Sequence, residues 1–506
     1  MNRARLKFLL WTLAAFTTGL LLRLYFVLHL SRVAGDSLVY GNIARTWLQH
    51  GVYGFTEIGP SGIDQYRPTL IRLPGYPLFL AVCFRLFGME NYTAVLYVQL
   101  VSDLVTCWLA AALAGRLFGR HTFLPVLWIA ALCPFTANYV ALPLTETLVL
   151  TTIALAFYAF ARWMDASHGF NRWLWIASTA IAYSILLRPD QGLLAAAILP
   201  AMLYRSLTAP ARLCRKASRT ARNTSPAMRK RHAHPLHSAL PVFVATLCIL
   251  LPLAPWTLRN QLTFHVFQPL APYYANDPDE AHPLGFARWY RTWAIDFTTT
   301  ETAYWNYPGD RIELSDLPSR AFDAGSPAAT EDLYRRTAAL LADYNRNSVA
   351  TPALDARFDD LARERITTHP MLCRIALPVA RLINMVLRPR TEAIPIDDKW
   401  WQWRDHPRES TFALAFAALN LVLFALALIG LARWLRRIWL SPADSVRRNN
   451  CALAFSMIAF LLLRATLLLT IDNSEPRYTL EFFPLLFVWI AALFLSPSPS
   501  QLSYST

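Results

Sequence analysis

Charged residues are scarce in this sequence, and its cysteines follow no recognisable spacing. Only 16% of the 506 residues are Asp, Glu, Lys or Arg, against about 25% in a typical soluble protein. The seven cysteines are odd in number and include no C-x-x-C pair. This excludes a disulfide framework and the usual zinc spacings, and we expect the cysteines to pack as small apolar residues.

Several nucleotide, metal and hydrolase motifs are also missing. The chain contains no Walker A, G-x-G-x-x-G, H-E-x-x-H or G-x-S-x-G motif, so neither a nucleotide donor nor a cofactor is predicted. His232, His234 and His237 lie in a basic segment. We expect them to be solvated, and no metal site is predicted because zinc sites need defined ligand spacing.

Apolar residues are abundant instead. Hydrophobic residues make up 55% of the chain and aromatic residues 13%, and the mean hydropathy is +0.30. Each of ten apolar runs is close to the roughly 20 residues that a helix needs to cross a bilayer. The composition therefore predicts an all-α polytopic membrane protein, with spans at 6–30, 91–115, 122–140, 145–163, 172–188, 190–205, 239–257, 411–432, 451–471 and 477–496.

The basic residues between these runs predict the orientation. The net charge is +15, and the 205–238 segment alone holds nine Arg or Lys and no acid. Cytoplasmic loops carry such an excess, which predicts that this segment and both termini lie on the cytoplasmic side of the inner or plasma membrane. Because the positive charge is located in short loops, we attribute it to topology and do not predict nucleic-acid binding.

Two longer pieces are then predicted to lie at the outer face, 31–90 and 258–409. The second contains 21 of the 33 acids with 18 Arg or Lys, a balance typical of a soluble region. Residues 75–88 are too short to cross the membrane, and we expect a helix that lies at the outer membrane surface or dips into the bilayer. Residues 371–388 are amphipathic and are expected at the membrane interface. The predicted divisions of the chain are 1–257, 258–409 and 410–506.

Acids near membrane depth are candidate functional residues, because burying a charge there is expensive. Asp36 follows the first span and Glu146 opens the fourth. Each also has a purely structural interpretation: Asp36 could cap a helix at 37–49, and Glu146 could stabilise a helix N-terminus. The other candidates are Asp103, which is mid-span, and Asp190, Asp472 and Glu475.

Four arginines accompany these acids at the predicted outer face. The guanidinium group is well suited to binding phosphate oxygens in a two-pronged fashion, although an arginine at this depth could equally reach lipid phosphates. The candidate anion ligands are Arg72, Arg188, Arg259 and Arg477.

The order of several motifs resembles the GT-C superfamily of membrane glycosyltransferases, and within it bacterial relatives of protein O-mannosyltransferases and aminoarabinose lipid A transferases. The chain departs from both groups, with Asp36-Ser37 in place of an Asp-Glu pair and Leu73-Pro74-Gly75 in place of a lysine before Pro-Pro. The matching segments are GDSLVYGNIARTWLQHGVYGF (35–55), RLPGYPLFLAVCFRLFG (72–88), PLTETL (143–148), LLRPDQGLL (186–194), APWTLRN (254–260) and EPRYTLEFFP (475–484).

The resemblance implies an inverting transfer of a hexose or pentose from a polyprenyl-phosphate donor to a hydroxyl acceptor on a lipid, glycan or protein. Asp36 and Glu146 would be the catalytic acids. The four arginines and Tyr478 would bind the donor phosphate or substrate, with Tyr40, Asp190 and Glu475 as further candidates. The alternative is a transporter or flippase of lipid-linked sugars, although the internal repeats typical of transporters are absent.

Overall fold

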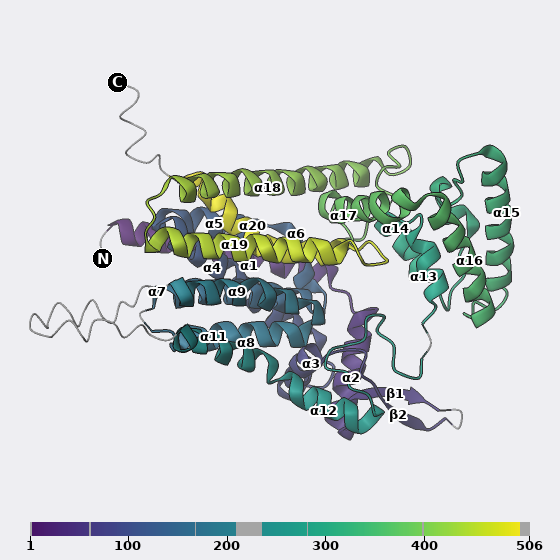
Figure 1. The fold of residues 1–506 in the computed structure, drawn as a ribbon, viewed down its shortest axis with the longest axis horizontal. Coiled ribbons are helices and arrows are strands. Elements are labelled where there is room, and N and C mark those ends of the chain that lie inside the picture. The colour runs from purple at the N-terminus through teal and green to yellow at the C-terminus, as the bar shows by residue number, and fades with distance from the viewer. Residues whose placement is uncertain are drawn as a thin grey trace, which may run out of the picture. The chain divides into compact units, whose positions relative to one another are not determined.

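The computed structural model describes residues 3–59, 62–166, 168–208, 235–280, 282–396 and 399–495. Most of the described residues are helical, and the strands among them form one short pair, which confirms the predicted all-α fold. The chain forms two compact units (Figure 1). The first comprises Met1–Asp277, Leu423–Leu463 and Glu481–Thr506, and the second Pro278–Val422 and Arg464–Leu480.

The first unit is a bundle of apolar helices. Helix α7 packs against α4 and α8, α4 against α5, and α11 against α8 and α9, and Figure 1 shows α8, α9 and α11 running side by side. The helices are α1 (Arg3–Leu30), α2 (Asp36–His50), α3 (Gly75–Phe87), α4 (Tyr92–Phe118), α5 (Phe123–Leu132), α6 (Pro134–Ala137), α7 (Glu146–Asp165), α8 (Arg172–Leu187), α9 (Gly192–Thr208), α11 (Pro235–Leu250), α12 (Leu253–Phe264) and α20 (Phe483–Ile490).

Two longer helices, α18 (Pro407–Leu440) and α19 (Ser445–Leu468), contribute to both units. Each of the ten predicted spans corresponds to helical structure. Judged by length and apolarity, seven helices in the described ranges can cross a membrane, or nine if each of two bent helix pairs forms one span. The chain is therefore a multi-pass membrane protein.

One predicted span, 122–140, is not a single straight helix. It consists of Arg120–Leu132 and Pro134–Ala141, which meet at an angle of 52°. Pro134 lacks the backbone N–H that would continue the α-helical hydrogen bonds, and its ring clashes with the preceding turn. The break leaves carbonyl groups of α5 without their usual helical donors.

Arg23 of α1 fills this gap inside the bundle. Its fully buried guanidinium donates to the Ala131 carbonyl over 2.6 Å, to the Ala130 carbonyl over 3.4 Å, and to the Asp103 carboxylate over 2.6 Å. Asp103 lies on α4 and is likewise buried. Because unsatisfied polar groups are costly in this environment, the ion pair joins α1, α4 and the broken span.

Residues 31–90 (the first outer segment of the predicted topology) fold as α2, a hairpin and α3. Strands β1 (Gly54–Ile58) and β2 (Asp64–Pro68) are antiparallel, with Gly54 opposite Pro68. Helix α2 ends at Gly51, which adopts the left-handed conformation common after a helix. The N-terminus of α3 lies so close to α8 that a Cβ atom on Gly75 would be 2.5 Å from the Leu186 carbonyl oxygen.

The second unit contains a core of aromatic side chains among α13 (Leu284–Arg291), α15 (Pro327–Tyr344) and α16 (Pro352–Thr368), with the short α14 (Phe297–Thr299) nearby in sequence. Ser326 and Thr351 cap the N-termini of α15 and α16, and each is followed by a proline, as is favoured at that position. The aromatic core is formed by Phe286, Trp289, Tyr290, Trp293, Tyr307, Tyr344 and Phe358.

The amphipathic segment 371–388 forms a π-helical turn followed by α17 (Leu377–Leu387). Its buried side carries Arg381, which donates to the backbone carbonyls of Arg291 and Ala294. Its apolar side chains on the other side are exposed at helical spacing, as expected of a helix at a membrane surface. These are Leu372, Ile375, Val379, Ile383 and Leu387.

Candidate functional site

Asp36 is the first residue of α2 and lies in an ion pair with Arg72. The Arg72 guanidinium donates to the Asp36 carboxylate over 2.9 Å, and 29% of the Asp36 side chain is exposed. Gly35 occupies the N-cap position of α2. The capping alternative for Asp36 is therefore wrong, because the helix begins one residue earlier than predicted and includes Asp36 in its first turn.

Glu146 begins α7 and is deeply buried beside Arg188. The distance from Arg188 Nη1 to the Glu146 carboxylate is 3.3 Å, and only 4% of the Glu146 side chain is exposed. Arg188 also contacts Asp190 over 3.1 Å and Glu481 over 3.8 Å. One guanidinium thus holds three carboxylates, at the start of α7, in the turn after α8 and in the segment before α20.

Tyr40 of α2 lies near both arginine–carboxylate groups. The Arg72 guanidinium lies over its ring at 5.7 Å from the centroid. Burial raises the pKa of the Tyr40 hydroxyl to about 12. The nearby negative charges of Asp36 and Glu146 raise this pKa further, whereas the positive charges of Arg72 and Arg188 lower it. All four charges therefore act on one phenol, which remains protonated at physiological pH.

A hydrogen-bonded chain fixes the position of this cluster relative to the bundle. The ring of Tyr40 packs edge-on against Tyr76 of α3, whose hydroxyl donates to the Gln99 side chain of α4 over 2.6 Å. Gln99 in turn donates to the Leu142 carbonyl over 2.8 Å. Because Leu142 lies four residues before Glu146, these contacts link α2 and α3 to the loop that precedes α7.

Arg259 of α12 binds backbone of the first outer segment. Its guanidinium donates to the Thr69 carbonyl over 2.8 Å and to the Tyr53 carbonyl over 2.7 Å, and it lies over the rings of Tyr53 and Trp256. The Tyr53 hydroxyl donates to the Arg72 carbonyl. Arg259 thus holds both ends of the hairpin and is connected through Tyr53 to the residue that pairs with Asp36.

The remaining predicted residues lie in the second unit. Glu475 is buried and accepts hydrogen bonds from Tyr478 over 2.8 Å and from Asn473 over 2.6 Å, and it also forms an ion pair with Arg477. Asp472 lies 3.3 Å from Arg291. Burial raises the pKa of the Asp472 carboxyl, partly offset by that arginine.

Glu481 and Gln191 were not predicted from the sequence. Gln191 donates to the Glu481 carboxylate over 2.6 Å, and both side chains are buried. Glu481 lies within an apolar run, where an acid is costly, and this signal could have identified it. Gln191 carried no such signal, because an uncharged amide within a loop motif is unremarkable.

The described residues contain no group of three or more His, Cys, Asp or Glu placed to hold a metal ion. Cys214, His232 and His234 lie outside the described residues. The other six cysteines are unpaired, and three of them are buried, as expected for small apolar residues: Cys83, Cys107 and Cys133.

The sequence model of the dolichyl-phosphate-mannose-protein mannosyltransferase family matches residues 68–217. No curated protein matches the chain.

Two solved structures resemble the fold at low sequence identity. The archaeal oligosaccharyltransferase AglB from Archaeoglobus fulgidus is 12% identical with a TM-score of 0.42, and the match covers 96% of this chain and 50% of that one. ArnT from Cupriavidus metallidurans is 13% identical with a TM-score of 0.34, covering 90% and 77%. The chain thus spans about half the length of the archaeal protein.

The family match covers Arg72, Glu146, Arg188 and Asp190, whereas Asp36 and Tyr40 precede it. It therefore includes the Glu146–Arg188 pair and the partner of Asp36. The predicted resemblance to the GT-C membrane glycosyltransferases is confirmed by this match.

Proposed function

We propose that this protein transfers a hexose or pentose from a polyprenyl-phosphate donor to a hydroxyl acceptor at the outer face of the membrane. The observation that carries the proposal is the grouping of Asp36–Arg72 and Glu146–Arg188 around Tyr40. Two acids and two arginines from separate outer segments are arranged there in one place. The family match supports the donor class, because its description names a dolichyl-phosphate sugar.

Asp36 is the proposed general base. Its carboxylate is more exposed than those of Glu146 and Glu481, so an acceptor hydroxyl can approach it. In the proposed reaction the acceptor oxygen attacks the anomeric carbon while its proton passes to Asp36. The bond between that carbon and the phosphate oxygen breaks, and the polyprenyl phosphate leaves with the electron pair.

Arginine side chains are the proposed stabilisers of the leaving phosphate. Arg72 and Arg188 are partly exposed and lie beside the acids. Their positive charge there would stabilise the negative charge that develops on the leaving phosphate. Glu146, with little exposure, is proposed to hold Arg188 in place. A single displacement of this kind inverts the configuration at the anomeric carbon and needs no covalent enzyme intermediate.

Arg259, Arg477 and Tyr478 remain proposed donor ligands, with Asp190 and Glu475 as supporting residues. Arg259 supports the first outer segment directly through its two carbonyl contacts. Arg477 is held beside Glu475 within the second unit.

The test is release of polyprenyl phosphate by the purified full chain in proteoliposomes that contain a radiolabelled polyprenyl-phosphate sugar and a membrane glycan extract as acceptor. Asp36→Asn is expected to lower turnover by a factor of about 10²–10⁴, because an amide cannot accept the proton, while donor binding is retained. A flippase would move the donor without releasing the phosphate.

Asp64→Asn is the matched control, since Asp64 is an exposed acid in the same outer segment. It is expected to leave turnover unchanged. Near-normal turnover by folded Asp36→Asn together with an inactive Glu146→Gln variant would instead assign the base role to Glu146.

A further inference from the structure

The second unit contains a cavity that the proposed reaction does not use. Its volume is about 420 Å³, within the range of small-molecule sites. Four segments contribute to it: the start of α14, the turn before α15, the end of α17 and the residues before α18. The lining residues are Asp296, Thr298, Pro318, Arg320, Asn384, Arg388, Trp400 and Trp401.

Two of the lining residues each carry a polar atom that has no hydrogen-bond partner among the residues that the structure describes. These are Nη2 of Arg388 and Oδ1 of Asn384. Arg388 is only 6% exposed; its Nε donates to the Pro389 carbonyl, and its guanidinium lies over the Phe297 ring. A buried donor and a nearby acceptor left unsatisfied are costly, so a ligand that satisfies both is favoured.

The charge of the cavity is positive across its described lining. Asp296 and Arg320 form an ion pair and offset each other, whereas Arg388 has no acidic partner in the described ranges. An unpaired guanidinium with a free donor is suited to a phosphate or carboxylate oxygen. The ligand is therefore expected to carry an anionic group.

The other wall is aromatic. Trp400 and Trp401 lie with their ring centroids 6.0 Å apart at nearly right angles, and 52% of Trp401 is exposed. A flat apolar ring beside hydrogen-bonding groups suits the C–H face of a pyranose, whose hydroxyls can reach the amide of Asn384 and the hydroxyl of Thr298. An uncharged apolar ligand would leave the polar groups unpaired.

We propose that this cavity binds an acidic saccharide, a sugar ring next to a phosphate or carboxylate, and that this saccharide is part of the acceptor. The assignment to the acceptor rests on the proposed glycosyltransferase function. It makes an acidic glycan or glycolipid the acceptor class.

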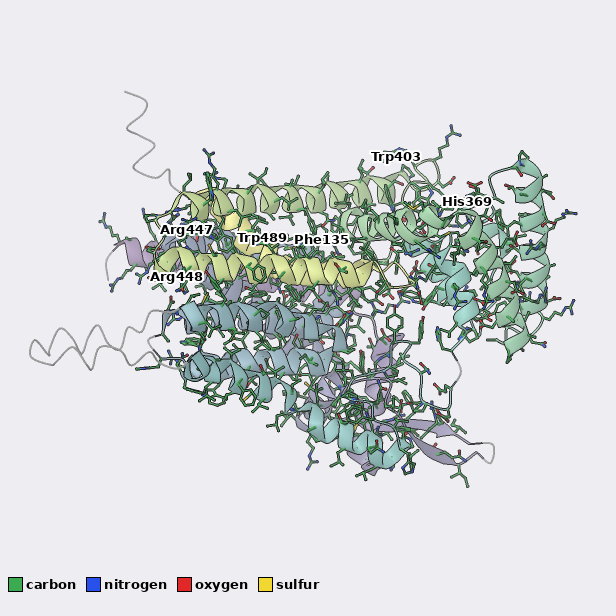
Figure 2. The ribbon with its side chains drawn as sticks, in the orientation of Figure 1. Phe135, His369, Trp403, Arg447, Arg448 and Trp489 are labelled. Atoms are coloured by element: carbon green, nitrogen blue, oxygen red, sulfur yellow. The ribbon has the colours of Figure 1, made fainter. Side chains whose placement is uncertain are left out.

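The same tryptophans have a competing explanation, because aromatic residues next to a membrane helix often lie at the lipid interface. Trp403 provides the comparison. It lies two residues from Trp401, precedes α18 in the same way (Figure 2) and is 51% exposed, but it does not line the cavity. Interfacial anchoring involves Trp401 and Trp403 equally, whereas saccharide binding requires Trp401.

The experiment measures binding to the full chain in phosphatidylcholine nanodiscs by saturation-transfer NMR. The probes are glucuronate and glucose 6-phosphate, which combine ring and anion, glucose, which has the ring alone, and glycerol 3-phosphate, which has the anion of a phospholipid headgroup. The two acidic sugars are expected to bind about tenfold more tightly than either of the others.

Three variants locate that binding. Trp401→Ala is expected to weaken binding of both acidic sugars at least severalfold. Arg388→Gln is expected to remove the preference for acidic over neutral sugar. Trp403→Ala is expected to change neither the binding of the acidic sugars nor that preference. Glycerol 3-phosphate binding as tightly as glucose 6-phosphate would identify a lipid-headgroup site and overturn the proposal, as would equal effects of Trp401→Ala and Trp403→Ala.

A final arm adds the polyprenyl-phosphate sugar to the same nanodiscs. Bound glucuronate is expected to remain, and its displacement by the donor would overturn the assignment to the acceptor. Because binding is measured without turnover, the outcome is separate from that of the proposed reaction. Loss of phosphate release with intact saccharide binding refutes the reaction, whereas normal release with no saccharide binding refutes this site.

Discussion

At the scale of single residues, ionised groups in this protein differ mainly in how completely neighbouring groups compensate their charge. Asp36 is paired but accessible, which suits a group that must exchange a proton with a substrate. Glu146 and Glu481 are buried around Arg188, which suits groups that hold a cation in place. The same residue types thus have different chemical uses because their exposure differs.

Both side chains of the Arg23–Asp103 pair are buried, and this leads to a prediction about stability. Arg23→Leu is expected to destabilise the folded protein by about 3–5 kcal/mol, because it leaves Asp103 buried without its counter-charge. It also removes the donors to the carbonyls of Ala130 and Ala131. Thermal unfolding in detergent, followed by loss of native fluorescence, measures the effect.

Two controls separate this effect from a general response to losing an arginine. Arg45→Gln breaks an exposed pair with Glu90 and is expected to cost about 1 kcal/mol or less. The double variant Arg23→Leu/Asp103→Leu is expected to recover part of the stability, since neither charge remains buried. Equal melting temperatures for wild type and Arg23→Leu would contradict the argument.

At the scale of elements, the helices were predictable and their junctions were not. Apolar runs of about 20 residues identify spans because the bilayer sets that length. The bend at Pro134 was within reach of the sequence, since proline interrupts a helix. The pairing of Arg23 with Asp103, 80 residues away, was not, because no local pattern relates residues on separate helices.

In the candidate site, too, the residues were predictable from the sequence but their contacts were not. Few charged residues lie at the predicted outer ends of the spans, so those that do stand out in the sequence. They include Asp36, Glu146, Arg72 and Arg188. Which arginine meets which acid depends on the packing of α2 against α3 and of α3 against α8, and this follows from contacts such as the close approach at Gly75. The exact start of α2 decided against the capping role of Asp36, and sequence patterns define helix ends poorly.

Arg259 gives a prediction at the element scale, because it joins α12 to the hairpin. Arg259→Lys retains the charge but loses the planar fork that contacts the Thr69 and Tyr53 carbonyls together. We expect faster hydrogen exchange throughout residues 53–69, which corresponds to a local loss of about 1–3 kcal/mol. We also expect a higher KM for the donor, because a loosened hairpin would shift Arg72, whose carbonyl is bound by Tyr53.

Arg85→Lys is the control for this substitution, since Arg85 is exposed on α3; neither exchange nor KM should change. If Arg259→Lys raises KM while exchange in the hairpin stays normal, Arg259 contacts the donor directly. If both stay normal, Arg259 has neither role.

At the scale of the whole molecule, the first unit has two chemically different ends. Helix α7 begins at Glu146, beside the candidate site, and ends at Asp165, about 30 Å away at the rise of an α-helix. At the far end Arg205 donates to the Asn449 side chain and to the Met164 carbonyl. The basic residues Arg447 and Arg448 lie at that same end of the bundle, at the start of α19 (Figure 2).

This separation gives the last prediction, the orientation in the membrane. The positive-inside rule places the Arg205 end in the cytoplasm, so the candidate site faces outward and 258–409 lies outside. In a variant whose seven native cysteines are replaced, Glu331→Cys, on the exposed face of α15, is expected to react with an impermeant maleimide in intact cells. Ser225→Cys, which lies outside the described residues, should react only after the membrane is permeabilised. Labelling of the cysteine at 225 in intact cells would reverse the orientation, and with it the proposal that the reaction takes place at the outer face.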